Sequence, residues 1–586
     1  MPSPFRPIYG AIPRPRWAVL APVALGTLVL AACQPGTGPG LASGAALTAA
    51  RPGSLQSCEA LAASLSLPHT RVLSSERVAA GAVQQGDRAV PEHCLVKGRM
   101  YERRGSDGRD YAIGFEMRLP TAWNGRFYYQ GNGGLDGAVL PALGALGGGP
   151  LTGALMQGFA VISSDAGHSG PQTPFFGLEP QARLDYGYQA VAKLTPMAKD
   201  LIRVAYGRAP DRSYIGGCSN GGRHTLVAAA RLGDQYDGYL VGAPGYRLPN
   251  AALAQLWGVQ QWAPLATPGA TTPHPMNPKA SIPDLGTAFT AQERQTVGQA
   301  ILNKCDALDG VRDGMVQAAQ ACQAAFSIDA VPTCTGARNG SCLTPEQKKT
   351  VAAVYAGGRT ASGQPIYSAF PWDVGVAGSN WAQWKFVNAI ALDPLAVGTV
   401  FTAPPAGKVD PLSADVSALL AQVAASNDIY RESGQSLMTP PGHEHPVNLM
   451  ALRERGAKVV LYHGVSDAIF SAEDTRQWLE RLNRTQGGKA DDMARYFPVP
   501  GMNHCSGGPA TDQFDLLAPL VAWVEQGVQP QAVLAQGRGV GHSAGVNAEL
   551  PADWSARRGR PLCAYPTVAR YTGTGSTEDA ANFVCQ

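Results

Sequence analysis

The sequence has almost no excess of charge, with a formal net charge of +3 at neutral pH. Three basic residues, Arg6, Arg14 and Arg16, precede residue 33 in a stretch without any acidic residue, so the rest of the chain is formally neutral. Proteins that bind nucleic acid usually carry a basic patch or stripe. This sequence has no such excess of basic residues, and we expect no nucleic-acid partner.

The sequence also lacks a convincing internal repeat and a second long apolar run. Its one long run, residues 17–30, is shorter than the roughly 20 residues that span a bilayer as a helix. The run follows basic residues and ends in Leu30-Ala31-Ala32-Cys33, which is the pattern of a lipoprotein signal. We expect residues 1–33 to be an export signal with lipid attached to Cys33. A plain signal peptide or membrane anchor is the alternative.

The residue after the lipidated cysteine is Gln34, and a residue other than Asp there usually sends a bacterial lipoprotein to the outer membrane. We therefore expect an outer-membrane lipoprotein, facing the periplasm or the cell surface, that meets the membrane only through its N-terminal lipid. Residues 34–54 begin with a Pro- and Gly-rich stretch and are expected to be a flexible tether.

Strand-like and helix-like patterns alternate along much of the chain. We expect strands at residues 111–119, 126–129, 160–163, 213–217 and 458–463, and helices at residues 189–206 and 222–232. Strands that each feed a helix indicate an α/β fold. Residues 250–447 are irregular and rich in Pro, Ala and Gln, which favours an inserted lid. The core is then residues 55–249 and 448–586.

Residues 217–221, Gly-Cys-Ser-Asn-Gly, fit the Gly-x-Ser-x-Gly pattern of a nucleophile elbow. Small residues let the chain turn sharply enough to expose the Ser219 hydroxyl. The pattern follows an expected strand and opens an expected helix, which is the context that an elbow requires. A plain glycine-rich turn is the alternative.

A serine hydroxyl needs a base that accepts its proton and a carboxylate that orients the base. Asp467 follows the expected strand at residues 458–463, and His504 lies in a later loop, so the order is Ser, Asp, His. Taken alone, Asp467 would be interpreted as a turn residue and His504 as a structural loop residue. The elbow upstream makes them candidates for the orienting acid and the general base.

Eleven cysteines, less Cys33, leave an even number in an exported chain, where disulfides form. Counting does not fix their connectivity. Proximity along the chain favours four pairs, Cys58–Cys94, Cys305–Cys322, Cys334–Cys342 and Cys563–Cys585. Cys218 and Cys505 remain for each other, and this bridge would fasten the loop of His504 to the elbow because the cysteines adjoin Ser219 and His504. A free thiol at each position is the alternative.

The Cys-Ser and His-Cys couplets at residues 218–219 and 504–505 resemble those of the tannase and feruloyl esterase family. The similarity runs from about residue 58 to residue 583 and is strongest at residues 217–222, 305–326, 458–470 and 499–509. The resemblance implies an α/β-hydrolase core with an inserted lid. It also places the family's catalytic triad on Ser219, Asp467 and His504.

The same resemblance implies further site residues. The backbone N–H groups of Gly134 and Asn220 would be the oxyanion donors, with a flexible loop as the alternative for Gly134. Trp384, His463 and Phe470 match aromatic or polar positions of the substrate pocket, although Trp384 and Phe470 fit the core equally well.

Residues 305–315 place three aspartates in one short loop with glycines. Carboxylate oxygens suit Ca²⁺, and the loop resembles the calcium site in the family's lid. The resemblance implies five ligands, which are the side chains of Asp306, Asp309 and Asp313 and the carbonyls of Val311 and Met315. A solvated acidic turn is the alternative. We expect a structural calcium ion and no organic cofactor.

The expected activity is hydrolysis, through an acyl-enzyme, of a small-molecule ester of feruloyl, galloyl or terephthaloyl type. One family member, which hydrolyses a terephthalate monoester, binds the free carboxylate of its substrate through an arginine of the lid. In this sequence, residues 385–405 contain no arginine. Lys385 offers a point charge without the fork geometry of arginine. A dedicated terephthalate-monoester hydrolase is therefore an alternative, as is a non-catalytic, calcium-stabilised lipoprotein that binds a ligand.

Overall fold

The computed structural model describes residues 46–145, 153–439 and 449–586. The expected signal, Cys33, most of the expected tether and residues 440–447 of the expected lid lie outside the described residues. Within the described ranges, no helix is both long enough and apolar enough to cross a membrane.

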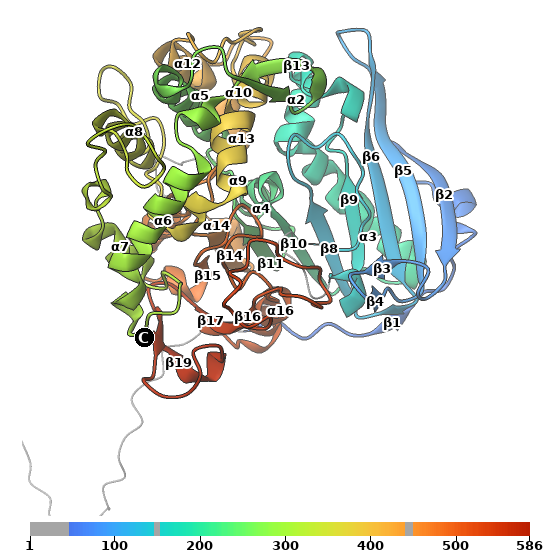
Figure 1. The fold of residues 1–586 in the computed structure, drawn as a ribbon. Helices are drawn as coiled ribbons and strands as arrows, with labels where there is room; N and C mark the ends of the chain where they lie inside the picture. The colour runs from blue at the N-terminus through green and yellow to red at the C-terminus, as the bar shows by residue number, and fades with distance from the viewer. Residues whose placement is uncertain (1–45, 146–152, 440–448) are drawn as a thin grey trace, which may run out of the picture. The chain divides into compact units, whose positions relative to one another are not determined.

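A mixed nine-stranded sheet runs through the described residues in the order β15-β14-β11-β10-β8-β9-β6-β5-β2 (Figure 1). The six strands from β15 to β9 in this order are parallel, whereas β6, β5 and β2 continue the sheet with antiparallel pairing. The strands are β2 (Thr70–Val78), β5 (His93–Arg104), β6 (Asp110–Pro120), β8 (Arg126–Gly131), β9 (Ala160–Ser164), β10 (Arg212–Cys218), β11 (Gly238–Gly242), β14 (Lys458–Gly464) and β15 (Ala494–Val499). All five expected strands are confirmed, with ends that differ by one or two residues.

Burial explains the apolar sequences of the parallel strands. Every residue of β11 and β14 is buried, as is nearly all of β10. Strands covered on both faces need apolar residues throughout rather than at alternate positions. At the other side of the sheet, β2 mixes half-buried and exposed residues, and the second half of β5 mixes buried and exposed ones, as expected where one face meets solvent.

Four long helices pack against the sheet, namely α3 (Ala190–Tyr206), α4 (Asn220–Arg231), α15 (Ala472–Thr485) and α16 (Leu517–Gln526). The first two confirm the helices expected at residues 189–206 and 222–232. Because parallel strands end at the same edge of a sheet, the loops after β8, β10, β14 and β15 meet there. These loops carry Gly134, Ser219, Asp467 and His504.

The segment after β11 is more helical than its composition suggested. Its helices are α5 (Leu248–Trp262), α6 (Ala291–Cys305), α7 (Ala319–Ala325), α8 (Pro345–Tyr355), α9 (Ser379–Ala382), α10 (Ala389–Ala391), α11 (Asp393–Ala396), α12 (Val416–Ala424) and α13 (Gly434–Met438), with π-helical turns η10 (Gln383–Asn388) and η11 (Val397–Phe401). Capping boxes start α6 at Thr290 and Glu293, and α8 at Thr344 and Gln347, and such local signals outweigh Pro-rich composition.

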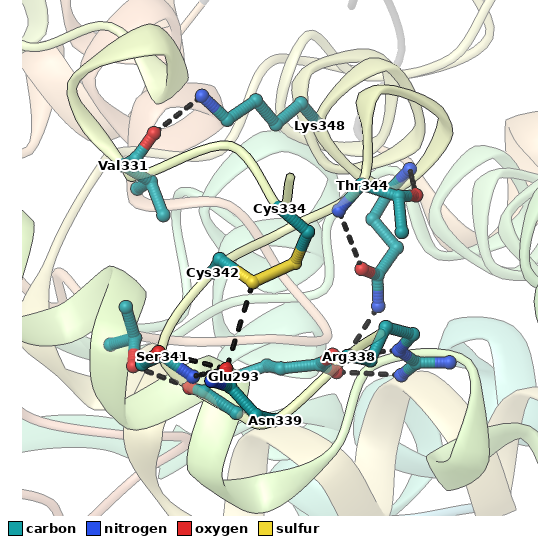
Figure 2. Close-up of a disulfide and its surroundings, with 12 residues drawn as sticks. Glu293, Val331, Cys334, Arg338, Asn339, Ser341, Cys342, Thr344 and Lys348 are labelled. Atoms are coloured by element: carbon teal, nitrogen blue, oxygen red, sulfur yellow. Dashed lines mark hydrogen bonds and ion pairs between the residues drawn. A yellow bond between two sulfur atoms is a disulfide. The ribbon is translucent and has the colours of Figure 1, made fainter. Parts of the chain in front are cut away.

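The lid helices share a hydrophobic cluster of their own, which includes Trp262, Phe289 and Trp381. The cluster extends to Ala468, Ile469 and Phe470, directly after Asp467, so the lid packs on the loop that carries the expected acid. Figure 2 shows the Cys334–Cys342 disulfide at the edge of this region; Arg338, in the loop that it closes, donates to Glu293 of α6.

The five expected disulfides are confirmed, including the bridge between Cys218 and Cys505. The remaining short elements are β1 (Gly53–Ser54), α1 (Leu61–Ser64), β3 (Gln84–Gln85), β4 (Arg88–Ala89), β7 (Ala122–Trp123), α2 (Pro180–Leu184), β12 (Thr271–His274), β13 (Asn277–Pro283), α14 (Met450–Glu454), β16 (Ala532–Gln536), β17 (Gly559–Cys563), β18 (Ala569–Tyr571) and β19 (Phe583–Cys585).

Candidate active site

Ser219 sits in the sharp turn between β10 and α4, with backbone angles φ 66° and ψ −126°. A non-glycine residue at positive φ is strained and needs support from its surroundings. The flanking glycines supply the space. A Cβ on Gly217 or Gly221 would lie 2.5 Å or 2.3 Å from the carbonyl oxygen of Gly131 in the neighbouring strand. The Gly-x-Ser-x-Gly pattern therefore follows from close backbone packing around the serine.

Ser219, His504 and Asp467 form a continuous chain of hydrogen bonds. The Ser219 Oγ lies 2.8 Å from His504 Nε2, and His504 Nδ1 lies 2.7 Å from Asp467 Oδ2. Asp467 is buried, while Ser219 and His504 are half-buried, and Ser219 lines the pocket. A histidine so placed can accept the serine proton while the carboxylate stabilises the resulting imidazolium.

The Asp467 carboxylate is held in its charged form. Burial acts to raise its pKa, but the charge of His504 and hydrogen bonds from both His463 and His504 outweigh burial and lower the pKa below its ordinary value. The backbone N–H groups of Ile469 and Phe470 also donate to Asp467 Oδ1, at 2.9 Å and 3.0 Å. A fixed, ionised acid is what orients a base histidine.

His463 lies behind the acid rather than in the pocket. It is fully buried, with Nε2 3.2 Å from Asp467 Oδ2 and Nδ1 2.8 Å from the hydroxyl of Thr475 in α15. The expectation that His463 lines the pocket was therefore wrong, because the strand end of β14 turns its ring toward Asp467. Sequence spacing signalled this, since His463 and Asp467 flank the same tight turn.

The Cys218–Cys505 disulfide joins the residues next to Ser219 and His504, with 6.0 Å between its Cα atoms. The two cysteines are 287 residues apart in the sequence. The bridge therefore ties the loop after β15 to the elbow and limits the positions that His504 can adopt relative to the serine.

Gly134 and Asn220 border the same pocket as Ser219. Asn220 is the first residue of α4, so its backbone N–H has no partner within the helix. Gly134 follows β8 with φ 64°, and a Cβ there would meet no atom within 4 Å. Both residues thus lie at the pocket of Ser219, with Asn220 at the positive end of the α4 dipole.

A buried polar network supports these two residues, and sequence reasoning missed it. The Asn220 side chain donates to Asp136 at 2.8 Å, and His224 Nε2 lies 2.8 Å from the same carboxylate oxygen. The Tyr186 hydroxyl lies 3.1 Å from Asn220 Oδ1 and 3.5 Å from the carbonyl of Gly134. The spacing of Asn220 and His224, one helical turn apart, was the only local signal for this network.

A cavity of about 280 Å³ opens at Ser219 between the elbow and the lid. Trp384 and Phe470 line it, as expected, and the rings of both lie 5.3 Å from the His504 ring in edge-on contact. Most of the other lining residues are apolar, from the core and from the lid. An aromatic group fits such a surface.

Lys385 follows Trp384 but is not among the residues that line the cavity. Its ammonium group stacks 3.6 Å from the centre of the Phe370 ring, and its side chain is buried. Burial lowers the pKa of Lys385 to about 7, against the opposing charges of Asp467 and Asp393. Asp393, which sequence reasoning missed, lines the cavity instead.

The aspartate carboxylates of the loop at residues 306–315 are only partly brought together. Asp306 Oδ1 accepts from the backbone N–H of Asp313 at 3.0 Å, and Asp313 pairs with the buried Arg560. Asp309 is buried, and its Oδ2 has no hydrogen-bond partner. Burial, followed by the charge of Asp313, raises the pKa of Asp309 to about 7.

In the part of the chain that the structure describes, no three His, Cys, Asp or Glu side chains are grouped so that they could hold a metal ion. The donor chemistry of the loop nevertheless fits a hard cation, because Asp309 Oδ2 is a buried carboxylate oxygen that nothing satisfies.

Known proteins share this arrangement of elements. The family model described as "Tannase and feruloyl esterase" matches residues 94–586. The chain belongs to the tannase and feruloyl esterase family. Among the relatives of this esterase, mono(2-hydroxyethyl) terephthalate hydrolase of Piscinibacter sakaiensis is 39% identical over 536 residues, which is 85% of each chain. Feruloyl esterase C of Talaromyces stipitatus is 27% identical over 497 residues, covering 81% of this chain and 82% of the relative.

The fold of this esterase is that of solved family members. The crystal structure of feruloyl esterase B from Aspergillus oryzae matches it with a TM-score of 0.70 and 24% identity, covering 90% of this chain and 99% of that one. The expected α/β-hydrolase fold is confirmed. Because its relatives are named esterases and hydrolases, the protein is a carboxylic ester hydrolase, and the alternative of a non-catalytic binding protein is not supported.

Proposed function

We propose that this esterase hydrolyses esters of aromatic acids through an acyl-enzyme formed on Ser219. The observation that carries the proposal is the chain of hydrogen bonds from Ser219 through His504 to the buried Asp467, at the mouth of a cavity lined by Trp384 and Phe470. A nucleophile, a base and an orienting acid in one line are what acyl transfer needs.

The reaction has two stages. Ser219 Oγ attacks the ester carbonyl while His504 Nε2 takes the hydroxyl proton, and the tetrahedral intermediate collapses as His504 protonates the leaving alcohol. A water molecule then attacks the acyl-enzyme with His504 as its base, which releases the aromatic acid and restores Ser219. Asp467 remains ionised throughout and stabilises the imidazolium.

The backbone N–H groups of Gly134 and Asn220 are the proposed donors to the oxyanion. Their placement before the reaction matters because a donor that is already oriented stabilises developing charge without further reorganisation. Two hydrogen bonds of the Asn220 side chain support this orientation, because it donates to Asp136 and accepts from the Tyr186 hydroxyl.

The proposal is tested by screening the purified protein against feruloyl, galloyl and terephthaloyl esters, alongside Ser219→Ala. The native protein should hydrolyse at least one class and react with a fluorophosphonate probe, whereas Ser219→Ala should be inert and unlabelled but folded. Undiminished hydrolysis by Ser219→Ala would contradict the assignment of the nucleophile.

Hydrolysis of mono(2-hydroxyethyl) terephthalate is the second candidate, since a relative with 39% identity bears that name. Residues 385–405 supply no arginine for the free carboxylate, and Lys385 stacks on Phe370 instead. We therefore favour uncharged aromatic acyl groups.

We also propose that Asp306, Asp309 and Asp313, with the carbonyls of Val311 and Met315, hold a structural Ca²⁺. The ion would offset the mutual repulsion of carboxylates and stiffen the loop, away from the ester chemistry. The unpartnered oxygen of Asp309 supports this proposal.

Export as an outer-membrane lipoprotein, with lipid on Cys33, is a further proposal that rests on the sequence of residues 1–34. Metabolic labelling with a palmitate analogue would detect the lipid, and Cys33→Ala should remove the label and release the protein from the membrane fraction.

A further inference from the structure

The cavity at Ser219 contains one ionisable side chain among its described lining residues, that of Asp393. Asp393 begins α11 in the lid, and the residues that follow it, Leu395 and Ala396, line the same apolar wall. A carboxylate in this position is unexpected, because the rest of the wall is suited to an uncharged ring.

The Asp393 carboxylate is also unsatisfied. Its Oδ2 is buried and has no hydrogen-bond partner among the described residues. Lys385 acts on Asp393 through its charge, but its ammonium group stacks on the ring of Phe370 at 3.6 Å. A buried polar group without a partner destabilises the empty site, and a ligand that supplies a donor removes this penalty.

We propose that Asp393 is a specificity-determining residue, which accepts a hydrogen bond from a phenolic hydroxyl on the acyl ring of the substrate. This proposal rests on the proposed esterase function and narrows its substrate class to hydroxylated aromatic acids, such as 4-hydroxycinnamates. A ring without a hydroxyl group leaves the Asp393 side chain unpaired, and a ring that carries a carboxylate brings a like charge once Asp393 is ionised.

The proposal accounts for two features together. The apolar walls and Trp384 pack against the face of a ring, while Asp393 hydrogen-bonds to one polar substituent on that ring. Sites that pair a buried polar group with a substrate hydroxyl reject the analogue without the hydroxyl more strongly than apolar pockets reject a change in size. The lid thereby supplies selectivity while the core supplies the chemistry.

The test compares methyl 4-hydroxycinnamate with methyl cinnamate, two esters that differ only by the ring hydroxyl and have the same leaving alcohol. We expect the native protein to favour the hydroxylated ester by about five- to a hundredfold in kcat/KM, the range for leaving a buried polar group without a partner. In Asp393→Ala the ratio should fall to near one, mainly through loss of activity on the hydroxylated ester.

Two further variants make the result specific. Asp393→Asn keeps an acceptor oxygen but cannot ionise, so it should retain part of the preference and, above about pH 8, gain activity on a terephthalate monoester relative to the native protein. Asp428→Ala, which removes an exposed lid aspartate, is the matched control and should leave the ratio unchanged. Melting temperatures would show that each variant is folded.

A native protein without preference for the hydroxylated ester, or a preference that survives Asp393→Ala, would overturn the proposal. If Asp393→Ala does not fold, an Asp393→Asn variant that gains nothing on the terephthalate monoester would overturn it equally. Absence of Ser219-dependent hydrolysis of both esters would instead contradict the proposed function, so the two failures are distinguishable.

Discussion

Removing the Cys218–Cys505 disulfide should reduce turnover more than it reduces substrate binding. The change is Cys218→Ser together with Cys505→Ser, which preserves the size of both side chains approximately. The bridge limits how far the His504 loop can move from the elbow, and neither cysteine lines the cavity.

The length of the loop that the disulfide closes determines how much it stabilises the folded protein. Chain-entropy arguments give about 5 to 6 kcal/mol for a closed loop of 287 residues, and about 2.5 kcal/mol for the 8-residue loop of Cys334–Cys342. Measured effects of disulfides are typically about 2 to 4 kcal/mol and fall below the chain-entropy value for long loops, so we expect a loss of about 3 to 4 kcal/mol.

The effect on catalysis follows from geometry. The Ser219 Oγ and His504 Nε2 lie 2.8 Å apart, and a misplacement of about 1 Å can cost about a hundredfold in rate. We expect kcat to fall about ten- to a hundredfold while KM changes little. The assay is steady-state hydrolysis of a chromogenic aryl ester, with unfolding by urea followed on the same preparations.

The matched control is Cys334→Ser with Cys342→Ser, which removes a bridge at the edge of the lid (Figure 2). It should lower the free energy of unfolding by about 2 kcal/mol and leave kcat unchanged. Equal kcat values for the native protein and the Cys218→Ser, Cys505→Ser variant, with both folded, would refute the idea that the bridge positions the base.

Three other predictions follow from the site. Tyr186→Phe removes the hydroxyl near Asn220 and Gly134 and should lower kcat about three- to tenfold without changing KM; an unchanged kcat would remove the support proposed for the oxyanion donors. Burial raises the pKa of Asp393 to about 8, partly offset by Lys385, so Asp393 becomes charged as the pH rises through that value. The ratio of kcat/KM for a terephthalate monoester to that for its uncharged benzoate analogue should therefore fall between about pH 7 and 9. In Asp393→Asn this ratio should not change with pH. Any effect of His504 on the rate is shared by both substrates, so it cancels in the ratio. Chelation should lower the melting temperature of the native protein but not of Asp309→Asn, and identical melting with and without chelator would contradict the calcium proposal.

Much of the core was predictable because its signals are local. Glycines at positions 217 and 221 are required by the approach of Gly131, so the elbow is visible in the sequence. Buried parallel strands such as β14 appear in the sequence as apolar runs, and the residues that follow them meet at one edge of the sheet. This placed Ser219, Asp467 and His504 in the same region before any contact was known.

The lid and the pocket were less predictable because their signals are not local. Asp393 is a single aspartate in an apolar segment, and only the packing of α11 against the cavity turns it into a site residue. His463 was expected in the pocket, yet its contacts with Asp467 and Thr475 place it behind the acid. The His463 contacts lie within 12 residues of it, but an apolar strand pattern does not show which way the ring at the strand end points.

The central claim is that the ester is cleaved through a covalent intermediate on Ser219. Rapid quenching of the reaction with an aromatic ester, followed by mass mapping of the peptides, tests it most directly. The proposal predicts an acyl group on the peptide that contains Ser219, absent in Ser219→Ala. An acyl group on another residue, or full hydrolysis by Ser219→Ala, would contradict it.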